Sequence, residues 1–235
     1  MRCECVRRRA SSRPPAPRVF LLSPANAGGE RAALLLRPAA SFPLAVQLRS
    51  PEGASLGDVF TFASGLYFRG KRTYAQAFGR APHPCPSCLV ITAGAGLLPL
   101  GTRVTAESLR LLAQIPIDGR EPRYREPLVR DAARLDEALG GRGEVVLLGS
   151  IATGKYTAPL LEVFGDRLLF PSAFVGRGDM SRGGLLLRAV RAGVELDYEP
   201  VRGAVRRGPR PPKLSSRKQA AERIGRRPTD RSPVR

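Results

Sequence analysis

Two glycine-rich turns constrain the fold of this chain more than any other feature. The segments LLGSIATGKYT (147–157) and FVGRGDMSRGG (174–184) each lie between an apolar run and an apolar, helix-like stretch. A strand that leads through a turn into a helix is the repeating unit of parallel α/β sheets. Glycines at the carboxyl ends of such strands let backbone N–H groups approach an anionic ligand. The sequence therefore predicts an α/β fold with an anion-binding edge.

The remaining pattern predicts a three-layer α/β sandwich with a mainly parallel, Rossmann-like central sheet and antiparallel strands allowed at its edges. We expect strands at 18–23, 89–92, 144–148, 168–170 and 195–198, and further edge strands at 32–37 and 44–49. We expect helices at 56–78 with hinges near Gly65 and Gly70, at 106–115 behind an N-cap at Thr105, and at 125–139, 156–164 and 184–192. Alternation of the two element types is typical of a sheet covered on both faces.

The charge of the chain is concentrated in its two ends. The formal net charge is +19, but residues 1–18 contribute +5 and residues 201–235 contribute +10, which leaves +4 for residues 19–200. We therefore predict one α/β domain at 19–200 between a disordered basic extension (1–18) and a disordered basic tail (201–235). Clustered arginines attract polyanions without reading sequence, so nucleic acid is an expected nonspecific partner of the tails.

Composition also bears on the origin and location of the protein. Arginine outnumbers lysine 35 to 4 in a chain rich in Ala, Gly and Pro, which is typical of a GC-rich bacterial genome. No apolar run approaches the roughly 20 residues that cross a bilayer, and the first 18 residues lack the apolar core of a signal peptide. We expect a cytoplasmic protein without a membrane partner.

The first glycine turn resembles a phosphate-binding loop but departs from it at one position. Residues Gly149 to Lys155 match G-x-x-x-x-G-K, whereas Tyr156 stands where the Mg²⁺-binding Ser or Thr belongs. No later strand ends in the aspartate of such a site. We expect either a smaller anion bound by Ser150, Lys155 and backbone N–H groups, or a purely structural turn.

The second turn offers side chains of both signs on a glycine-rich backbone. Arg177, Asp179, Ser181 and Arg182 could bind a sugar or base, and the alternative is a solvated loop. A dinucleotide fingerprint does not fit, because Ser181 replaces its third glycine and no acid follows at the required distance. Asp179 is the one candidate general base.

Tyr67 and Lys71 show the Tyr-x-x-x-Lys spacing of short-chain dehydrogenases. One helical turn would place the phenol beside the ammonium, and this would lower the pKa of the phenol. That enzyme class is disfavoured because the first strand lacks a glycine-rich cofactor turn. Lys71 and Tyr74 remain candidate ligand-binding groups.

The cysteines predict neither a metal nor a redox centre. Cys3 and Cys5 would have to fold back onto Cys85 and Cys88 to bind zinc, and Cys88 leads into a strand rather than opening a helix. We therefore expect no metal and no cofactor.

Four segments, GLYFRGKRTYAQAF, LVITAGAGLLP, VVLLGSIATGKYTAPLL and GRGDMSRGGLLLR, resemble in order blocks of bacterial α/β domains of unknown function. The resemblance spans residues 64–190. Those families often carry Ser-Ala-Lys where this chain has Thr92, Ala93 and Gly94, so chemistry that depends on that lysine is not expected here. Some of these domains are distantly similar to nucleobase-handling folds of the uracil-DNA glycosylase type, which implies a nucleobase ligand.

These observations favour a protein that binds a nucleotide, nucleobase or nucleic acid through the loops at the carboxyl edge of its sheet. The expected ligand-binding residues are Ser23, Asn26, Lys71, Tyr74, Thr92, Gly149, Ser150, Lys155, Arg177, Ser181 and Arg182, with Asp179 as the catalytic candidate. The alternative is a non-catalytic adaptor whose basic tails dock on an acidic partner.

Overall fold

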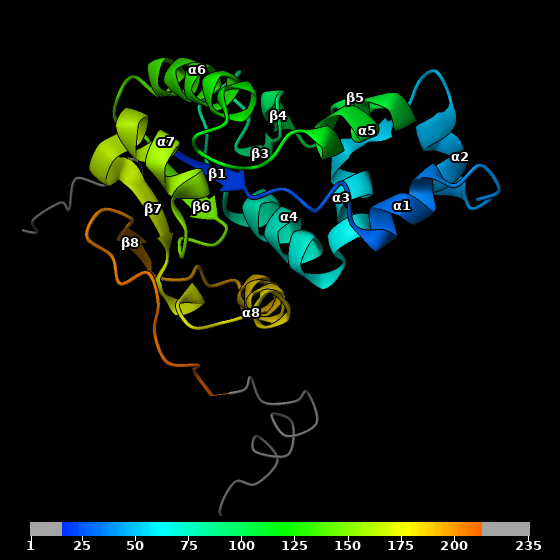
Figure 1. Ribbon diagram of the computed structural model, residues 1–235. Coiled ribbons are helices and arrows are strands. Elements are labelled where there is room, and N and C mark those ends of the chain that lie inside the picture. Colours follow the sequence, from blue (N-terminus) through cyan, green and yellow to red (C-terminus); the bar gives the residue numbers. More distant parts are fainter. Residues whose placement is uncertain (1–15, 213–235) are drawn as a thin grey trace, which may run out of the picture.

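A six-stranded sheet forms the centre of the protein, in the order β4-β3-β1-β6-β7-β8. The computed structural model describes residues 16–212 (Figure 1). Four strands are parallel, namely β1 (Arg18–Leu22), β3 (Cys88–Thr92), β6 (Glu144–Leu148) and β7 (Leu168–Pro171). The edge strands β4 (Gly96–Pro99) and β8 (Tyr198–Pro200) are antiparallel to their neighbours. The predicted fold class, a three-layer sandwich with a mainly parallel sheet, is confirmed.

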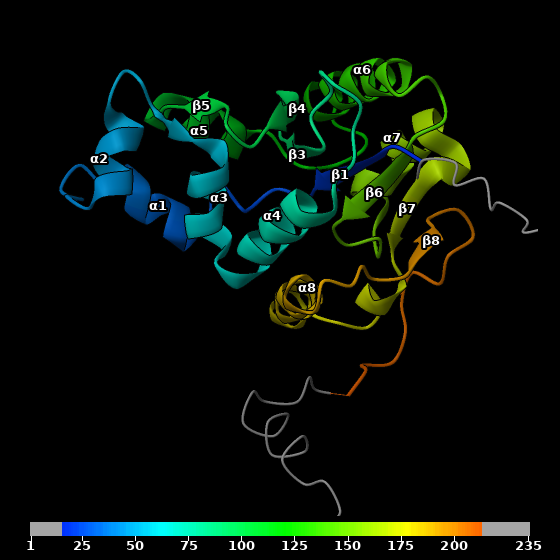
Figure 2. The same cartoon turned by 180° about the vertical axis from the view of Figure 1, so that it is seen from behind.

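The sheet is buried on both faces because apolar side chains occupy most positions of its central strands and point to both sides. Phe20 and Leu22 of β1 belong to one core cluster, while Val19 and Leu21 belong to the other, as the two-residue period of a strand requires. Helices α4 (Leu66–Phe78) and α8 (Asp179–Ala192) cover the first face. Helices α6 (Pro122–Ala138) and α7 (Gly154–Phe164) cover the second, as Figures 1 and 2 show from opposite sides.

Helices α4 and α8 cross at a pair of glycines. A Cβ at Gly70 would lie 2.8 Å from the carbonyl oxygen of Gly183, and a Cβ at Gly183 would lie 2.7 Å from that of Leu66. Neither position has space for a side chain, so the two backbones approach more closely than larger residues allow. This contact brings the first turn of α8 next to the first turn of α4.

A lobe of short helices lies beside the sheet (Figures 1 and 2). It contains α1 (Glu30–Leu36), α2 (Pro43–Arg49), α3 (Leu56–Ser64), α5 (Ala106–Gln114) and a small antiparallel pair, β2 (Ala54–Ser55) with β5 (Arg103–Val104). The prediction of edge strands at 32–37 and 44–49 is wrong, because both segments are helical. Their buried residues, Ala32 with Leu35 and Ala45 with Leu48, are three apart rather than two, and Pro43 occupies the first helical position, where proline is tolerated.

Most other element predictions agree with the structure within a few residues. Thr105 caps α5 by accepting a hydrogen bond from the Ser108 N–H, as expected. Gly65 separates α3 from α4, but Gly70 lies inside α4 and does not break it. The last helix begins at Asp179, five residues earlier than predicted, and β8 begins only at Tyr198. Single-turn 3-10 helices η1 (Gly165–Arg167) and η2 (Ser172–Phe174) flank β7.

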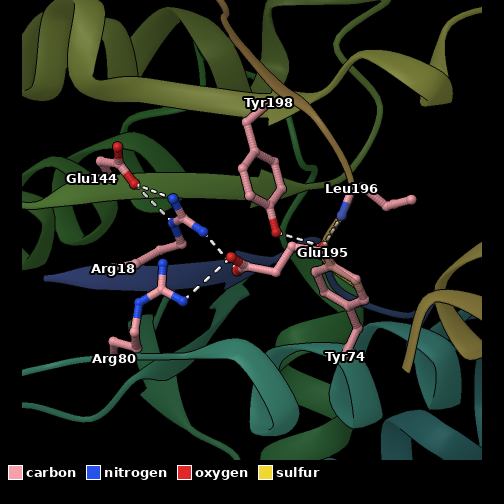
Figure 3. A network of polar contacts seen from close by, with 7 residues as sticks. All are labelled: Arg18, Tyr74, Arg80, Glu144, Glu195, Leu196 and Tyr198. Carbon is pink, nitrogen blue, oxygen red and sulfur yellow. Dashed lines mark hydrogen bonds and ion pairs between the residues drawn. The ribbon is translucent and has the colours of Figure 1, made fainter. Parts of the chain in front are cut away.

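An ion-pair network, hereafter the amino-end network, closes the sheet where β1 and β6 begin (Figure 3). Arg18 binds Glu144 at 2.5 Å and Glu195 at 2.6 Å, and Arg80 binds the second oxygen of Glu195 at 3.2 Å. The Arg18 side chain is only 12% exposed, so its charge depends on these two carboxylates. The network therefore holds the segment before β8 against the sheet.

Two tyrosines adjoin the amino-end network on the α4 face of the sheet. The hydroxyls of Tyr74 and Tyr198 are 2.5 Å apart, and the Tyr74 oxygen also accepts the N–H of Leu196 at 2.8 Å (Figure 3). Phe20 packs edge-on against Tyr74 at a centroid separation of 5.6 Å. The tyrosine hydroxyls are thus hydrogen-bonded, whereas the Nε of Arg80 in the adjoining network has no partner within the described chain.

Candidate functional site

A pocket of about 650 Å³ lies at the carboxyl edge of the sheet, between the sheet and the helical lobe. The chain leaves β1 toward α4 on one face and leaves β6 toward α7 on the other, although β1 and β6 are neighbours. Loops that diverge in this way open a crevice at the strand ends, which is where open α/β sheets bind ligands. The topology thus accounts for the position of the pocket.

Three groups of residues line the pocket. The sheet edge contributes Ser23 after β1, Ala93 after β3 and Ser150 after β6. The lobe contributes Phe60, Ala63 and Ser64 of α3, Leu112 and Ala113 of α5, and the segment 115–117 that follows α5. The first turns of three helices complete the wall with Tyr67, Lys155, Tyr156 and Asp179. The pocket therefore combines aromatic surface with a few polar groups, as small-molecule sites do.

Lys71 lies directly behind Ser23 and is completely buried. Its ammonium nitrogen is 2.5 Å from the Ser23 carbonyl oxygen and 2.9 Å from Ser23 Oγ. It also lies 4.4 Å from the Tyr67 ring centroid, and no carboxylate within residues 16–212 forms an ion pair with it. Burial lowers the pKa of Lys71 to about 7, because the charged form loses its hydration.

Tyr67 carries a polar atom that the surrounding protein leaves unpaired. The residue is 5% exposed and lines the pocket, and its hydroxyl has no hydrogen-bond partner within the described part of the chain. Burial raises the pKa of Tyr67; Arg182 opposes this shift and Asp179 adds to it, each by less than burial. The expectation that Lys71 lowers this pKa is wrong, since desolvation of the phenolate outweighs the neighbouring cation.

The first turns of α7 and α8 bring opposite charges to the pocket. Lys155 is the only basic residue among the described lining residues, and it stands in the first turn of α7, whose N-cap Thr153 makes no side-chain capping bond. Asp179 opens α8 and lies 3.6 Å from Arg182, with 69% of its side chain exposed. The start of α7 favours an anion because helix N–H dipoles point toward it.

Five of the predicted site residues line one pocket. They are Ser23, Asn26, Ser150, Lys155 and Asp179, and Lys71 joins them through its contacts with Ser23. Gly149 lies just beneath, where a Cβ would be 3.0 Å from the Cβ of Ser23. The glycine at this position lets β1 and β6 hold their loops close together.

The other predicted site residues make contacts away from the pocket. Thr92 is buried and donates to the Gly96 carbonyl, and Tyr74 belongs to the tyrosine pair beside the amino-end network. Arg177 donates to the carbonyl of Ala173 and to Ser181 Oγ, and Arg182 donates to the carbonyl of Phe174. Arg177, Ser181 and Arg182 therefore hold the turn before α8 in place. None of these five predicted residues lines the wall of the pocket.

Sequence reasoning missed the aromatic side of the site. Phe60, Tyr67 and Tyr156 line the pocket, and none of them was among the expected ligand-binding residues. The signal available in the sequence was the Tyr-x-x-x-Lys spacing at Tyr67 and Lys71, which does place the two side chains together.

Within residues 16–212, no cluster of three or more His, Cys, Asp or Glu is arranged to hold a metal ion, and Cys3 and Cys5 lie outside this range. The helices of the same range include none with the length and apolar character to cross a bilayer.

No family model, curated protein or solved structure matches the chain.

Proposed function

We propose that the pocket binds a nucleotide or a nucleobase-containing ligand. The observation that carries this proposal is the convergence of aromatic and charged groups at the crossover point of the sheet. A volume of about 650 Å³ is within the range of small-molecule sites. Tyr67 and Tyr156 offer ring surface to a planar base, and Lys155 at the start of α7 offers a positive site to a phosphate.

Hydrogen-bonding groups around the pocket suit the rest of such a ligand. Asn26, Asp179 and the unpaired Tyr67 hydroxyl supply acceptors and donors for the edge of a base or for sugar hydroxyls. Asp179 is the only carboxylate among the described lining residues, so it is also the candidate general base if the ligand is a substrate. The resemblance of residues 64–190 to domains similar to nucleobase-handling folds supports the same ligand class.

Calorimetric titration of the full chain with nucleosides, nucleoside 5′-monophosphates and inorganic phosphate tests the proposal. Lys155→Ala should weaken monophosphate binding about tenfold and leave nucleoside binding nearly unchanged, because only the phosphate makes the charge-assisted bond. Arg142→Ala is the matched control, since Arg142 is exposed and precedes β6 at the opposite edge of the sheet.

Binding through the basic tails gives a different result. Such binding would collapse between low and physiological salt and would weaken equally in both variants. That outcome, or no binding by any member of the panel, would contradict the proposal.

A further inference from the structure

The most unusual group outside the proposed binding contacts is the buried amine of Lys71. It is 0% exposed and does not line the pocket, whereas Ser23, which it contacts at 2.9 Å, does. The amine therefore lies one hydrogen bond behind the pocket wall at Ser23. A buried lysine without a carboxylate partner is costly to a fold, and its contact with a pocket-lining hydroxyl points to a chemical role.

We propose that Ser23 and Lys71 form a serine–lysine catalytic dyad that cleaves small carboxylic esters or activated amides. Ser23 Oγ is the nucleophile, and the Nζ of Lys71 is its general base. This activity stands on the geometry of the dyad and does not depend on whether nucleotides bind.

The reaction has two balanced halves. The Ser23 oxygen attacks the carbonyl carbon while its proton passes to Lys71 Nζ, and the tetrahedral species collapses as the same proton goes to the departing alcohol or amine. Water then attacks the acyl-serine, Lys71 takes a proton from that water, and the proton returns to Ser23 Oγ as the acid leaves. The sum is ester plus water giving acid plus alcohol, with the enzyme unchanged.

The hydrogen-bond geometry suits a neutral lysine in this role. Lys71 Nζ donates to the Ser23 carbonyl at 2.5 Å and to Ser23 Oγ at 2.9 Å. When the amine is neutral, its lone pair can instead accept the Ser23 O–H across the same 2.9 Å. Ser23 Oγ also lies 3.3 Å from the Leu148 carbonyl, which keeps the hydroxyl at the end of the strand. Lys155 and the first turn of α7 lie in the same pocket, where N–H dipoles and a cation stabilise a developing oxyanion.

The charged surroundings of Lys71 are nearly balanced. From α8, Asp179 raises its pKa and Arg182 lowers it, and from β3 Cys88 raises it slightly. The acid on α3 that lies near this helix, Asp58, pairs with Arg72 instead. Burial therefore dominates, and the amine loses its proton near neutral pH, where a general base is most effective.

Labelling of the full chain with a small alkyl fluorophosphonate tests the dyad. The serine oxygen displaces fluoride from phosphorus and the proton leaves with it, so one covalent adduct per chain is expected on Ser23, located by peptide mass spectrometry. The rate should rise with pH through about 7 and then level, following the pKa of Lys71. Ser23→Ala should abolish the adduct, and Ser41→Ala, a change at an exposed serine outside the pocket wall, should leave it unchanged.

Two lysine variants separate base catalysis from support of the fold. Lys71→Met should slow labelling of Ser23 at least 100-fold. Lys71→Arg retains a cation but no base and should be equally slow. If either variant fails to fold, as judged by circular dichroism, the pH profile and the two serine variants decide the question. No adduct, an adduct on Ser64 or Ser150, or a labelling rate independent of pH between 6 and 9 would overturn the dyad.

The two proposals can fail separately. Nucleotide titration of Ser23→Ala measures binding without the nucleophile, and fluorophosphonate labelling measures the nucleophile without a nucleotide. A chain that labels at Ser23 but binds no nucleotide keeps the dyad and loses only the proposed ligand class.

Discussion

The two ends of the central sheet use polar residues in opposite ways. Where β1 and β6 begin, Arg18 is enclosed by two carboxylates and the hydroxyls of Tyr74 and Tyr198 share a hydrogen bond, although the Nε of Arg80 is unpaired within the described chain. Where the same strands end, Lys71 is buried without a carboxylate and the Tyr67 hydroxyl is unpaired within the described chain. A buried cation with carboxylate partners can stabilise a fold, whereas a buried cation without one reduces its stability and is typical of sites that act on a ligand. The difference separates the end that supports the fold from the end with the candidate site.

The largest expected effect is at the amino-end network. Arg18→Met leaves Glu144 and Glu195 without their shared partner, so the free energy of unfolding should fall by about 2–3 kcal/mol. Urea denaturation measures this change. Arg120→Ala, which removes an exposed pair with Asp118, should cause no measurable loss. An equal response of the two variants would contradict the assignment of the network as the stabilising end.

The next largest effect is a dependence of stability on pH that comes from Lys71. The unfolded amine has a pKa near 10.5 and the folded amine one of about 7, so above pH 7 the unfolded state binds more protons and stability rises with pH. We expect a rise of up to about 1.4 kcal/mol per pH unit between pH 7 and 8.5 that is absent in Lys71→Met. Urea melts of both proteins at each pH give the difference.

The pH range of this measurement ends at 8.5 because Cys88 affects stability at higher pH. Burial raises the pKa of Cys88 to about 12, so above the ordinary thiol pKa of 9.0 this residue begins to lower stability with rising pH. Identical slopes for wild type and Lys71→Met would show that the folded amine keeps an ordinary pKa.

A matched pair of tyrosine variants on α4 compares the two ends directly. Tyr74→Phe removes a hydroxyl that contacts Tyr198 and accepts the N–H of Leu196, so stability should fall by about 1–2 kcal/mol. Thermal or urea unfolding checks the value. A change below about 0.5 kcal/mol would show that these contacts contribute no net stability.

Tyr67→Phe should give the smallest change in stability. The hydroxyl it removes has no protein partner in the described structure, so the free energy of unfolding should stay within about 0.5 kcal/mol or rise. Nucleotide affinity, measured by calorimetry, should fall in this variant and remain unchanged in Tyr74→Phe. The reverse pattern would mean that the carboxyl end is not the binding end.

The parallel strands could be predicted because each is a mostly apolar run with a glycine or proline near both ends. The helices of the lobe could not be predicted. Segments 32–37 and 44–49 are too short for apolar residues spaced two apart to be distinguished from apolar residues spaced three apart. Pro38 and Pro43 separate these segments and suggested two strands, but Pro43 starts a helix.

The candidate site was predicted in part. Residues directly after strands, such as Ser23 and Ser150, follow from the rule that strand ends converge. Arg177 and Ser181 bind each other instead, because the early start of α8 places them on a turn and a helix whose contacts the sequence does not show. Tyr67 and Lys71 meet Ser23 only through the packing of α4 on β1, a tertiary contact without a local sequence signal.

The glycine crossing of α4 and α8 also sets the order in which the pocket can form during folding. Ser23 lies near the start of the described chain, and Asp179 begins its last helix. Contacts between segments so distant in sequence close late, because the loop between them must first lose its conformational entropy. The pocket is complete only when α8 docks on Gly70, so the rate at which refolding protein becomes able to label at Ser23 would report the final step of folding.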